Sequence, residues 1–153
     1  MKRNRVRFHI HPFAAAGLFL LFAAMPRAYA FAAVSSVLLH EAGHMTAALL
    51  LDKRVTEIRL MPVGISIGLS AAASYREEFL IAAAGPFMSL LYAGAAFFWM
   101  PQEIGASVCS LSLSLAVLNL LPLKTLDGGR MAGALLSQLF GEEASDKVLY
   151  VST

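Results

Sequence analysis

Two histidines and a glutamate at helical spacing are the residues best suited to chemistry in this 153-residue chain. His40 and His44 lie four positions apart, about 400° around a helix, so both imidazoles leave the same face and can bind one metal ion. Glu41 follows the first histidine and lies beside the pair, where it can act as a base on a water molecule. This pattern predicts a catalytic metal site.

The surroundings of this motif are apolar. It lies inside an almost uninterrupted apolar stretch from Ala28 to Leu51. The same His-Glu-x-x-His pattern can arise by chance in a soluble helix, where its side chains face water. The flanking residues here offer Glu41 no solvated face, and a charge in a membrane helix costs roughly 2.5–3.5 kcal/mol. A zinc-protease motif in such a helix indicates a protease that cuts inside or beside the bilayer.

The composition predicts an α-helical integral membrane protein. The chain is 58% hydrophobic and 14% charged, whereas soluble domains carry about 25% charged residues. Four transmembrane segments are expected, at Phe13–Met25, Ala28–Leu51, Phe79–Met100 and Ile104–Leu121. The first reaches only about 20 Å against a hydrocarbon core of about 30 Å. It therefore either extends back through His9 or forms a shallow helix.

The basic residues indicate how these segments are oriented. They fall in blocks between the apolar segments, and four crossings from an inside N-terminus put all of them except Arg27 on the cytoplasmic side. The start resembles a signal peptide, with Arg27–Ala30 as a small-residue cleavage site. Cleavage is not expected, because a second apolar segment carrying the metal motif follows at once. We therefore predict a cytoplasmic N-terminus.

A catalytic zinc site needs a third protein ligand, and Asp127 is the best candidate. It lies between Pro122 and Gly128-Gly129, which break the helix where one apolar run ends and another begins. Unwound backbone at membrane depth is tolerated only beside protein or a water-filled cavity. Taken alone, Asp127 is more typical of a turn that caps a helix over Gly128–Phe140. The metal motif, which lacks a third ligand, favours ligation.

A β-hairpin is expected in the main polar interval. Val55–Leu60 and Ile65–Ser70 have strand-like patterns, and Pro62–Gly64 supplies a turn between them. Two interpretations stay open: a surface hairpin of no special role, or an edge that accepts an extended substrate by strand addition. His9 and His11 precede Pro12 at the membrane edge, where an interfacial role is favoured over metal ligation.

Three motifs stand in the order and spacing of a known family. They are His40-Glu41-x-x-His44, Ala84-Gly85-Pro86, and Asn119-x-x-Pro122-x-x-x-x-Asp127-Gly128. With them, the chain resembles the site-2 protease family (peptidase M50) of intramembrane zinc metalloproteases. His9–Phe13, Leu60–Gly64 and Glu77–Phe79 look like segments of its stage IV sporulation protease branch.

The resemblance implies a site and a fold. Zinc would be held by His40, His44 and Asp127, with Glu41 as general base. Asn119 would help to position substrate or stabilise a developing oxyanion, and a membrane-associated hairpin would line the substrate path. The fold would be a truncated six-helix core, a single membrane-embedded domain over residues 1–153 without the last two helices and regulatory domain of the sporulation branch.

The implied function is a zinc metalloendopeptidase of the bacterial cytoplasmic membrane. Its expected partners are the lipid bilayer, membrane inhibitors or regulatory proteins, and a membrane-tethered substrate such as an inactive sigma-factor precursor; nucleic acid is not expected. An inactive or truncated membrane module is one alternative. A metal transporter is another, although transport does not require Glu41 and the chain shows no inverted repeat.

Overall fold

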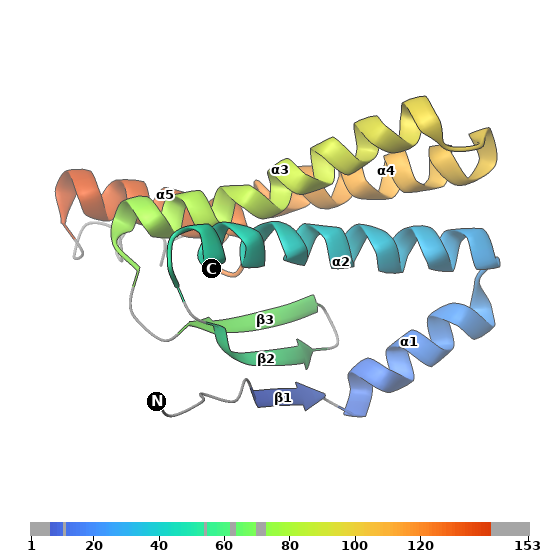
Figure 1. Ribbon diagram of the computed structural model, residues 1–153, viewed down its shortest axis with the longest axis horizontal. Coiled ribbons are helices and arrows are strands. Elements are labelled where there is room, and N and C mark those ends of the chain that lie inside the picture. Colours follow the sequence, from blue (N-terminus) through green and yellow to red (C-terminus); the bar gives the residue numbers. More distant parts are fainter. Residues whose placement is uncertain (1–6, 11, 54, 62–63, 70–72, 142–153) are drawn as a thin grey trace.

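The computed structural model describes residues 7–10, 12–53, 55–61, 64–69 and 73–141. Five helices and three strands lie in these ranges (Figure 1). In chain order they are β1 (Arg7–Ile10), α1 (Pro12–Ala24), α2 (Arg27–Leu50), β2 (Val55–Met61), β3 (Gly64–Leu69), α3 (Tyr75–Trp99), α4 (Gln102–Asn119) and α5 (Asp127–Phe140).

The helices fall where the apolar segments were expected, and the structure excludes one of the two alternatives for the first segment. Helix α1 begins at Pro12 and does not extend back through His9. Residues Arg7–Ile10 instead form strand β1, which the sequence reading missed. Proline favours the first position of a helix, because its fixed φ suits the helix and its missing N–H is not needed there.

The predicted hairpin is confirmed, and β1 joins it to make a three-stranded sheet. β2 pairs antiparallel with β3, from Val55 opposite Leu69 to Met61 opposite Gly64. β1 pairs parallel with β2 on the other side. The sheet lies on the side of α2 away from α3 and α4 (Figure 1). A side-chain contact also joins β1 and β2, since His9 Nε2 lies 3.2 Å from Glu57 Oε1.

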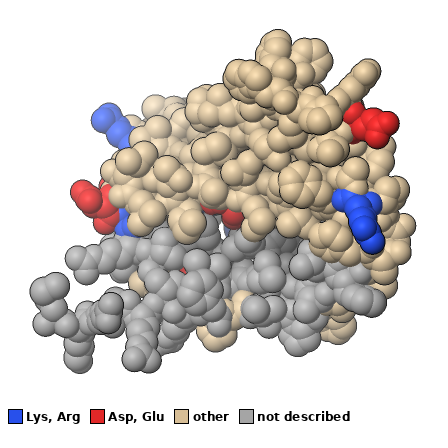
Figure 2. Space-filling view, turned by 45° about the vertical axis from the view of Figure 1, so that its right-hand side comes forward, with Lys and Arg blue, Asp and Glu red and all other residues tan. Residues whose placement is uncertain are grey.

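Helices α2, α3 and α4 pack through small side chains. The buried hydrophobic residues are almost all alanine, and a Cβ added at Gly43 would lie 2.5 Å from the Ala84 carbonyl oxygen. Large apolar side chains point outward instead; Phe98 and Trp99 are 75% and 83% exposed. Figure 2 shows that few charged side chains lie on this face and that most of them stand near its two ends. Small residues inside and large apolar residues outside are typical of helices packed in lipid.

Polar contacts link the same helices in their buried interior. Ser36 of α2 and Ser112 of α4 share a hydrogen bond of 2.8 Å between their hydroxyl groups. The Tyr92 hydroxyl of α3 donates to Ser35 Oγ at 3.0 Å. Such bonds hold helices together where apolar packing alone gives little preference between neighbours.

The prediction of four membrane crossings is not confirmed. Among the described residues, one helix, α3, is long and apolar enough to cross a membrane, judged by length and composition alone. It continues through Pro86 without a break. Its first turn is fixed by a capping box between Ser74 and Glu77, and Lys53 Nζ lies 2.8 Å from Glu77 Oε2. The start of α3 is therefore tied to the end of α2.

Candidate metal centre

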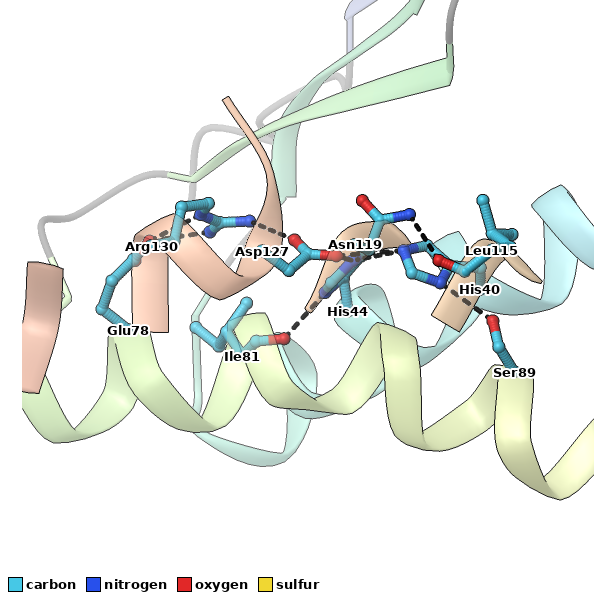
Figure 3. Close-up of polar contacts among 9 residues, drawn as sticks. All are labelled: His40, His44, Glu78, Ile81, Ser89, Leu115, Asn119, Asp127 and Arg130. Carbon is cyan, nitrogen blue, oxygen red and sulfur yellow. Dashed lines mark hydrogen bonds and ion pairs between the residues drawn. The ribbon is translucent and has the colours of Figure 1, made fainter. Parts of the chain in front are cut away.

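The three predicted metal ligands come together in the buried interior (Figure 3). His40 and His44 lie one turn apart on α2, and Asp127 opens α5. Asp127 Oδ2 lies 3.0 Å from His40 Nε2 and 3.2 Å from His44 Nε2. The two Nε2 atoms are themselves 3.2 Å apart. These three residues are 4–7% exposed, so bulk water does not reach most of their surface.

Both imidazole rings are held through their other nitrogen. His44 Nδ1 donates to the Ile81 carbonyl oxygen at 2.7 Å, because a carbonyl can only accept. His40 Nδ1 shares a hydrogen bond of 2.9 Å with the Ser89 hydroxyl. This arrangement leaves each Nε2 for a metal, since ligating histidines ordinarily use their second nitrogen to fix the ring.

The distances among His40 Nε2, His44 Nε2 and Asp127 Oδ2 fit a metal ion bound between them. A neutral His44 has its proton on Nδ1, so its Nε2 presents a lone pair to the lone pairs of Asp127 Oδ2. A cation among these atoms removes that repulsion. Tetrahedral zinc with bonds of about 2.0–2.1 Å keeps its ligand atoms about 3.3 Å apart. The observed separations of 3.0–3.2 Å are close to that value.

The side-chain type of Asp127 suits ligation as well. Catalytic zinc sites combine histidine with a carboxylate, which binds the metal in its deprotonated form.

Helix α3 leaves room for the two imidazoles at Gly85. A Cβ added there would lie 2.2 Å from His44 Nε2 and 2.9 Å from His40 Nε2. Any larger residue would occupy the space of the metal ligands. Gly85, which the sequence reading named as part of the Ala84-Gly85-Pro86 family motif, thus forms one wall of the site.

Backbone packing places Asp127. Residues 120–126 form an irregular turn between α4 and α5, and Gly128 and Gly129 lie directly against it. Added Cβ atoms at these glycines would stand 2.2 Å from the Leu120 carbonyl oxygen and 2.0 Å from that of Leu123. The two glycines therefore let the start of α5 press against the turn, which brings the Asp127 carboxylate to the histidines.

The structure places the remaining residues named in the sequence analysis in different surroundings. Glu41 is half-buried on α2, close enough for its charge to act on His44. Asn119 ends α4, and its Nδ2 donates to the Leu115 carbonyl oxygen at 3.0 Å (Figure 3). Its predicted role toward substrate stays a prediction. Strand residue His9 is paired with Glu57 away from the centre, and His11 lies outside the described residues.

Sequence reasoning missed two polar groups at this site. Arg130 donates through Nε and Nη2 to Glu78 Oε1, at 2.9 and 2.8 Å, and its Nη1 lies 3.4 Å from Asp127 Oδ1. Its position three residues after Asp127 on a helix was a readable signal. Glu78 is 52 residues away, and no local pattern indicates that pair.

A buried His-His-Asp set with a glutamate beside the first histidine defines the class of protein as one with a metallohydrolase-type centre on a helical scaffold. A family model described as Peptidase M50B-like matches residues 13–136. The chain belongs to this metalloprotease family, and the predicted resemblance is confirmed.

Two curated relatives and one solved structure are similar to the chain. Stage IV sporulation protein FB of Bacillus subtilis is 30% identical over 144 residues, which are 87% of this chain and 49% of that protein. A zinc metalloprotease of Methanocaldococcus jannaschii is 30% identical over 122 residues, 74% of this chain and 35% of that protein. The site-2 protease structure from Methanocaldococcus jannaschii matches with a TM-score of 0.72 at 24% identity, over 93% of this chain and 72% of that one.

These matches differ in what they cover. The chain spans about half of the first relative and about a third of the second. The structural match, at this low identity, shows a shared fold.

Proposed function

We propose that this chain is an intramembrane zinc metalloendopeptidase that cuts a membrane-tethered protein. The observation that carries the proposal is the buried triangle of His40 Nε2, His44 Nε2 and Asp127 Oδ2, with Glu41 on the same helix. A metal-binding role alone would need the triangle but not the glutamate. Family membership and the name of the archaeal relative support zinc as the metal.

Each residue has a distinct task in the proposed reaction. His40, His44 and Asp127 hold zinc, which when bound supplies a Lewis acid that acidifies water and polarises a carbonyl. Glu41 accepts the proton of the attacking water and delivers it to the leaving amine. Asn119, at the end of α4, is proposed to orient the substrate or stabilise the developing oxyanion. The carbonyls of a helical peptide are engaged in hydrogen bonds, so the substrate must unwind before attack.

We propose that the helices around the site lie in the bilayer, with the N-terminus in the cytoplasm. The outward Phe, Leu and Trp side chains of α2, α3 and α4 support this location, as do their alanine-rich contacts. In the described part of the sheet, β3 is an edge strand next to β2. Its outer edge offers main-chain groups to an extended substrate segment by strand addition. An inactive sigma-factor precursor, as in sporulation, is the proposed substrate type.

The test combines metal content with cleavage in the same preparations. Zinc per chain is measured in detergent-purified protein, beside His44→Ala and Asp127→Ala. Cleavage is measured by co-expression with a membrane-tethered sigma-factor precursor and detection of a shorter product. Glu41→Gln should bind zinc as the unchanged chain does and yield no product.

Four results would contradict the proposal. The unchanged chain without zinc would favour an inactive membrane module. Zinc binding that survives both ligand substitutions would place the metal elsewhere. Full cleavage by Glu41→Gln would exclude the glutamate as general base. Zinc transport by the unchanged chain without any proteolysis would favour a transporter.

A further inference from the structure

The Asp127 carboxylate has two oxygens with different neighbours. Oδ2 faces both histidines, at 3.0 and 3.2 Å, whereas Oδ1 lies 3.4 Å from Arg130 Nη1. A carboxylate held through both oxygens has one orientation about its Cβ–Cγ bond. The Oδ1 atom of Asp127 is therefore held by the guanidinium group of Arg130, three residues later on the same helix.

Arg130 is itself held from a second helix. Its Nε and Nη2 both donate to Glu78 Oε1 on the first turn of α3, at 2.9 and 2.8 Å. Helix α5 packs on α3, so this pair joins the two helices beside the metal ligand. Arginine suits the position because its planar fork reaches two carboxylates at fixed angles, which a lysine ammonium does not do.

We infer that Arg130, anchored by Glu78, is a positioning residue that sets the orientation of Asp127 toward the metal. This inference rests on the proposed zinc site, and it concerns how tightly that site binds. Arg130 and Glu78 are 38% and 32% exposed at their side chains, so their direct contribution to stability is small. Their effect is instead on the ligand, and groups that support a metal ligand typically change metal affinity by about 10- to 100-fold.

The experiment measures Zn²⁺ affinity by chelator competition on the detergent-purified full chain. Arg130→Met, which keeps the length of the side chain, should weaken Zn²⁺ binding about 10- to 100-fold. Arg130→Lys should recover only part of that loss. Glu78→Gln should weaken binding less, and adding it to Arg130→Met should produce no further loss, because Glu78 acts through Arg130.

A matched control uses the ion pair of Glu77, the residue before Glu78. Lys53→Met removes the 2.8 Å ion pair with Glu77, also on the first turn of α3 but without a contact to Asp127 in the described structure. Its Zn²⁺ affinity should equal that of the unchanged chain. The visible absorption of bound Co²⁺ reports ligand geometry, so it should change in Arg130→Met and not in Lys53→Met.

The outcomes separate this inference from the proposed function. Failure of the unchanged chain to bind Zn²⁺ overturns both. Zinc binding by the unchanged chain with an equal affinity in Arg130→Met overturns the inference alone. An equal loss in Arg130→Met and Lys53→Met also overturns it, since it would reflect loosening of the end of α3. Should Arg130→Met not fold, Arg130→Lys and Glu78→Gln answer the same question.

Discussion

Gly85→Ala tests whether the metal centre depends on the space that α3 leaves for it. The added Cβ would stand 2.2 Å from His44 Nε2, and ordinary van der Waals contact begins at 3.4 Å. The ring must therefore retreat by about 1.2 Å, since repulsion rises steeply inside the contact distance. Metal–ligand distances tolerate shifts of only about 0.2 Å. We expect His44 to stop acting as a ligand.

The same substitution should have a smaller effect on the fold. Helix propensity favours alanine over glycine by about 0.8–1.0 kcal/mol, whereas crowding at a buried position costs about 1–3 kcal/mol, so the two effects partly cancel and the metal-free protein should still fold. Changes to groups that only support a ligand cost about 10- to 100-fold in metal affinity. Loss of the ligand itself should therefore weaken Zn²⁺ binding by more than about 100-fold, or roughly 2.7 kcal/mol.

The assay compares Zn²⁺ affinity and thermal unfolding with those of Gly94→Ala. Gly94 is on the same helix, and a Cβ there would meet nothing within 4 Å. That variant should keep its zinc affinity and gain up to about 1 kcal/mol of stability. If Gly85→Ala binds zinc as tightly as Gly94→Ala does, the centre does not need the space at residue 85 and the reasoning is refuted.

Two further substitutions test hydrogen bonds of the buried interior. Ser89→Ala removes the partner of His40 Nδ1 and should lower Zn²⁺ affinity about 10-fold, measured beside Ser110→Ala, whose hydroxyl bonds only within α4; equal affinities would show that Ser89 does not orient the ring. Ser36→Ala should lower the free energy of unfolding by about 0.6–1.7 kcal/mol, because it leaves the Ser112 hydroxyl without its partner. In a double-mutant cycle, Ser36→Ala and Ser112→Ala should then lose less than the sum of their single effects, and full additivity would contradict the bond.

The ligand set was predictable where local chemistry dictated it. His40 and His44 share a helix, so their spacing alone places both rings on one face. Asp127 was predictable because it lies at a helix break beside an apolar run, where unwound backbone is tolerated only beside protein or a cavity. The zinc motif also lacked a third ligand, which an aspartate can supply. The groups that orient the two histidines were not predictable from local pattern. Ile81 and Ser89 reach the histidines across an α2–α3 contact that no local pattern encodes.

In the fold, too, the elements with a local sequence signal were predictable and those that depend on distant contacts were not. The hairpin was predicted from alternation within short segments, and the helices from long apolar runs. Strand β1 was missed because its four residues pair with β2 about 50 positions away, in parallel, without a turn to mark the register. Among the described helices only α3 combines the length and the apolar composition of a membrane crossing. Helix α1, with 13 residues, is too short to span about 30 Å.

Helix α3 contributes no metal ligand, yet it fixes the orientation of all three. Four residues of α3 contact the candidate ligands or the arginine beside them. They are separated by three, four and four positions, so they lie along one face of the helix. Gly85 on that face lies directly against both imidazole rings. A rotation of α3 about its axis would therefore disturb the contacts to all three candidate ligands together. The four positions are Glu78, which acts through Arg130 on Asp127, Ile81 on His44, Gly85 beside both rings, and Ser89 on His40.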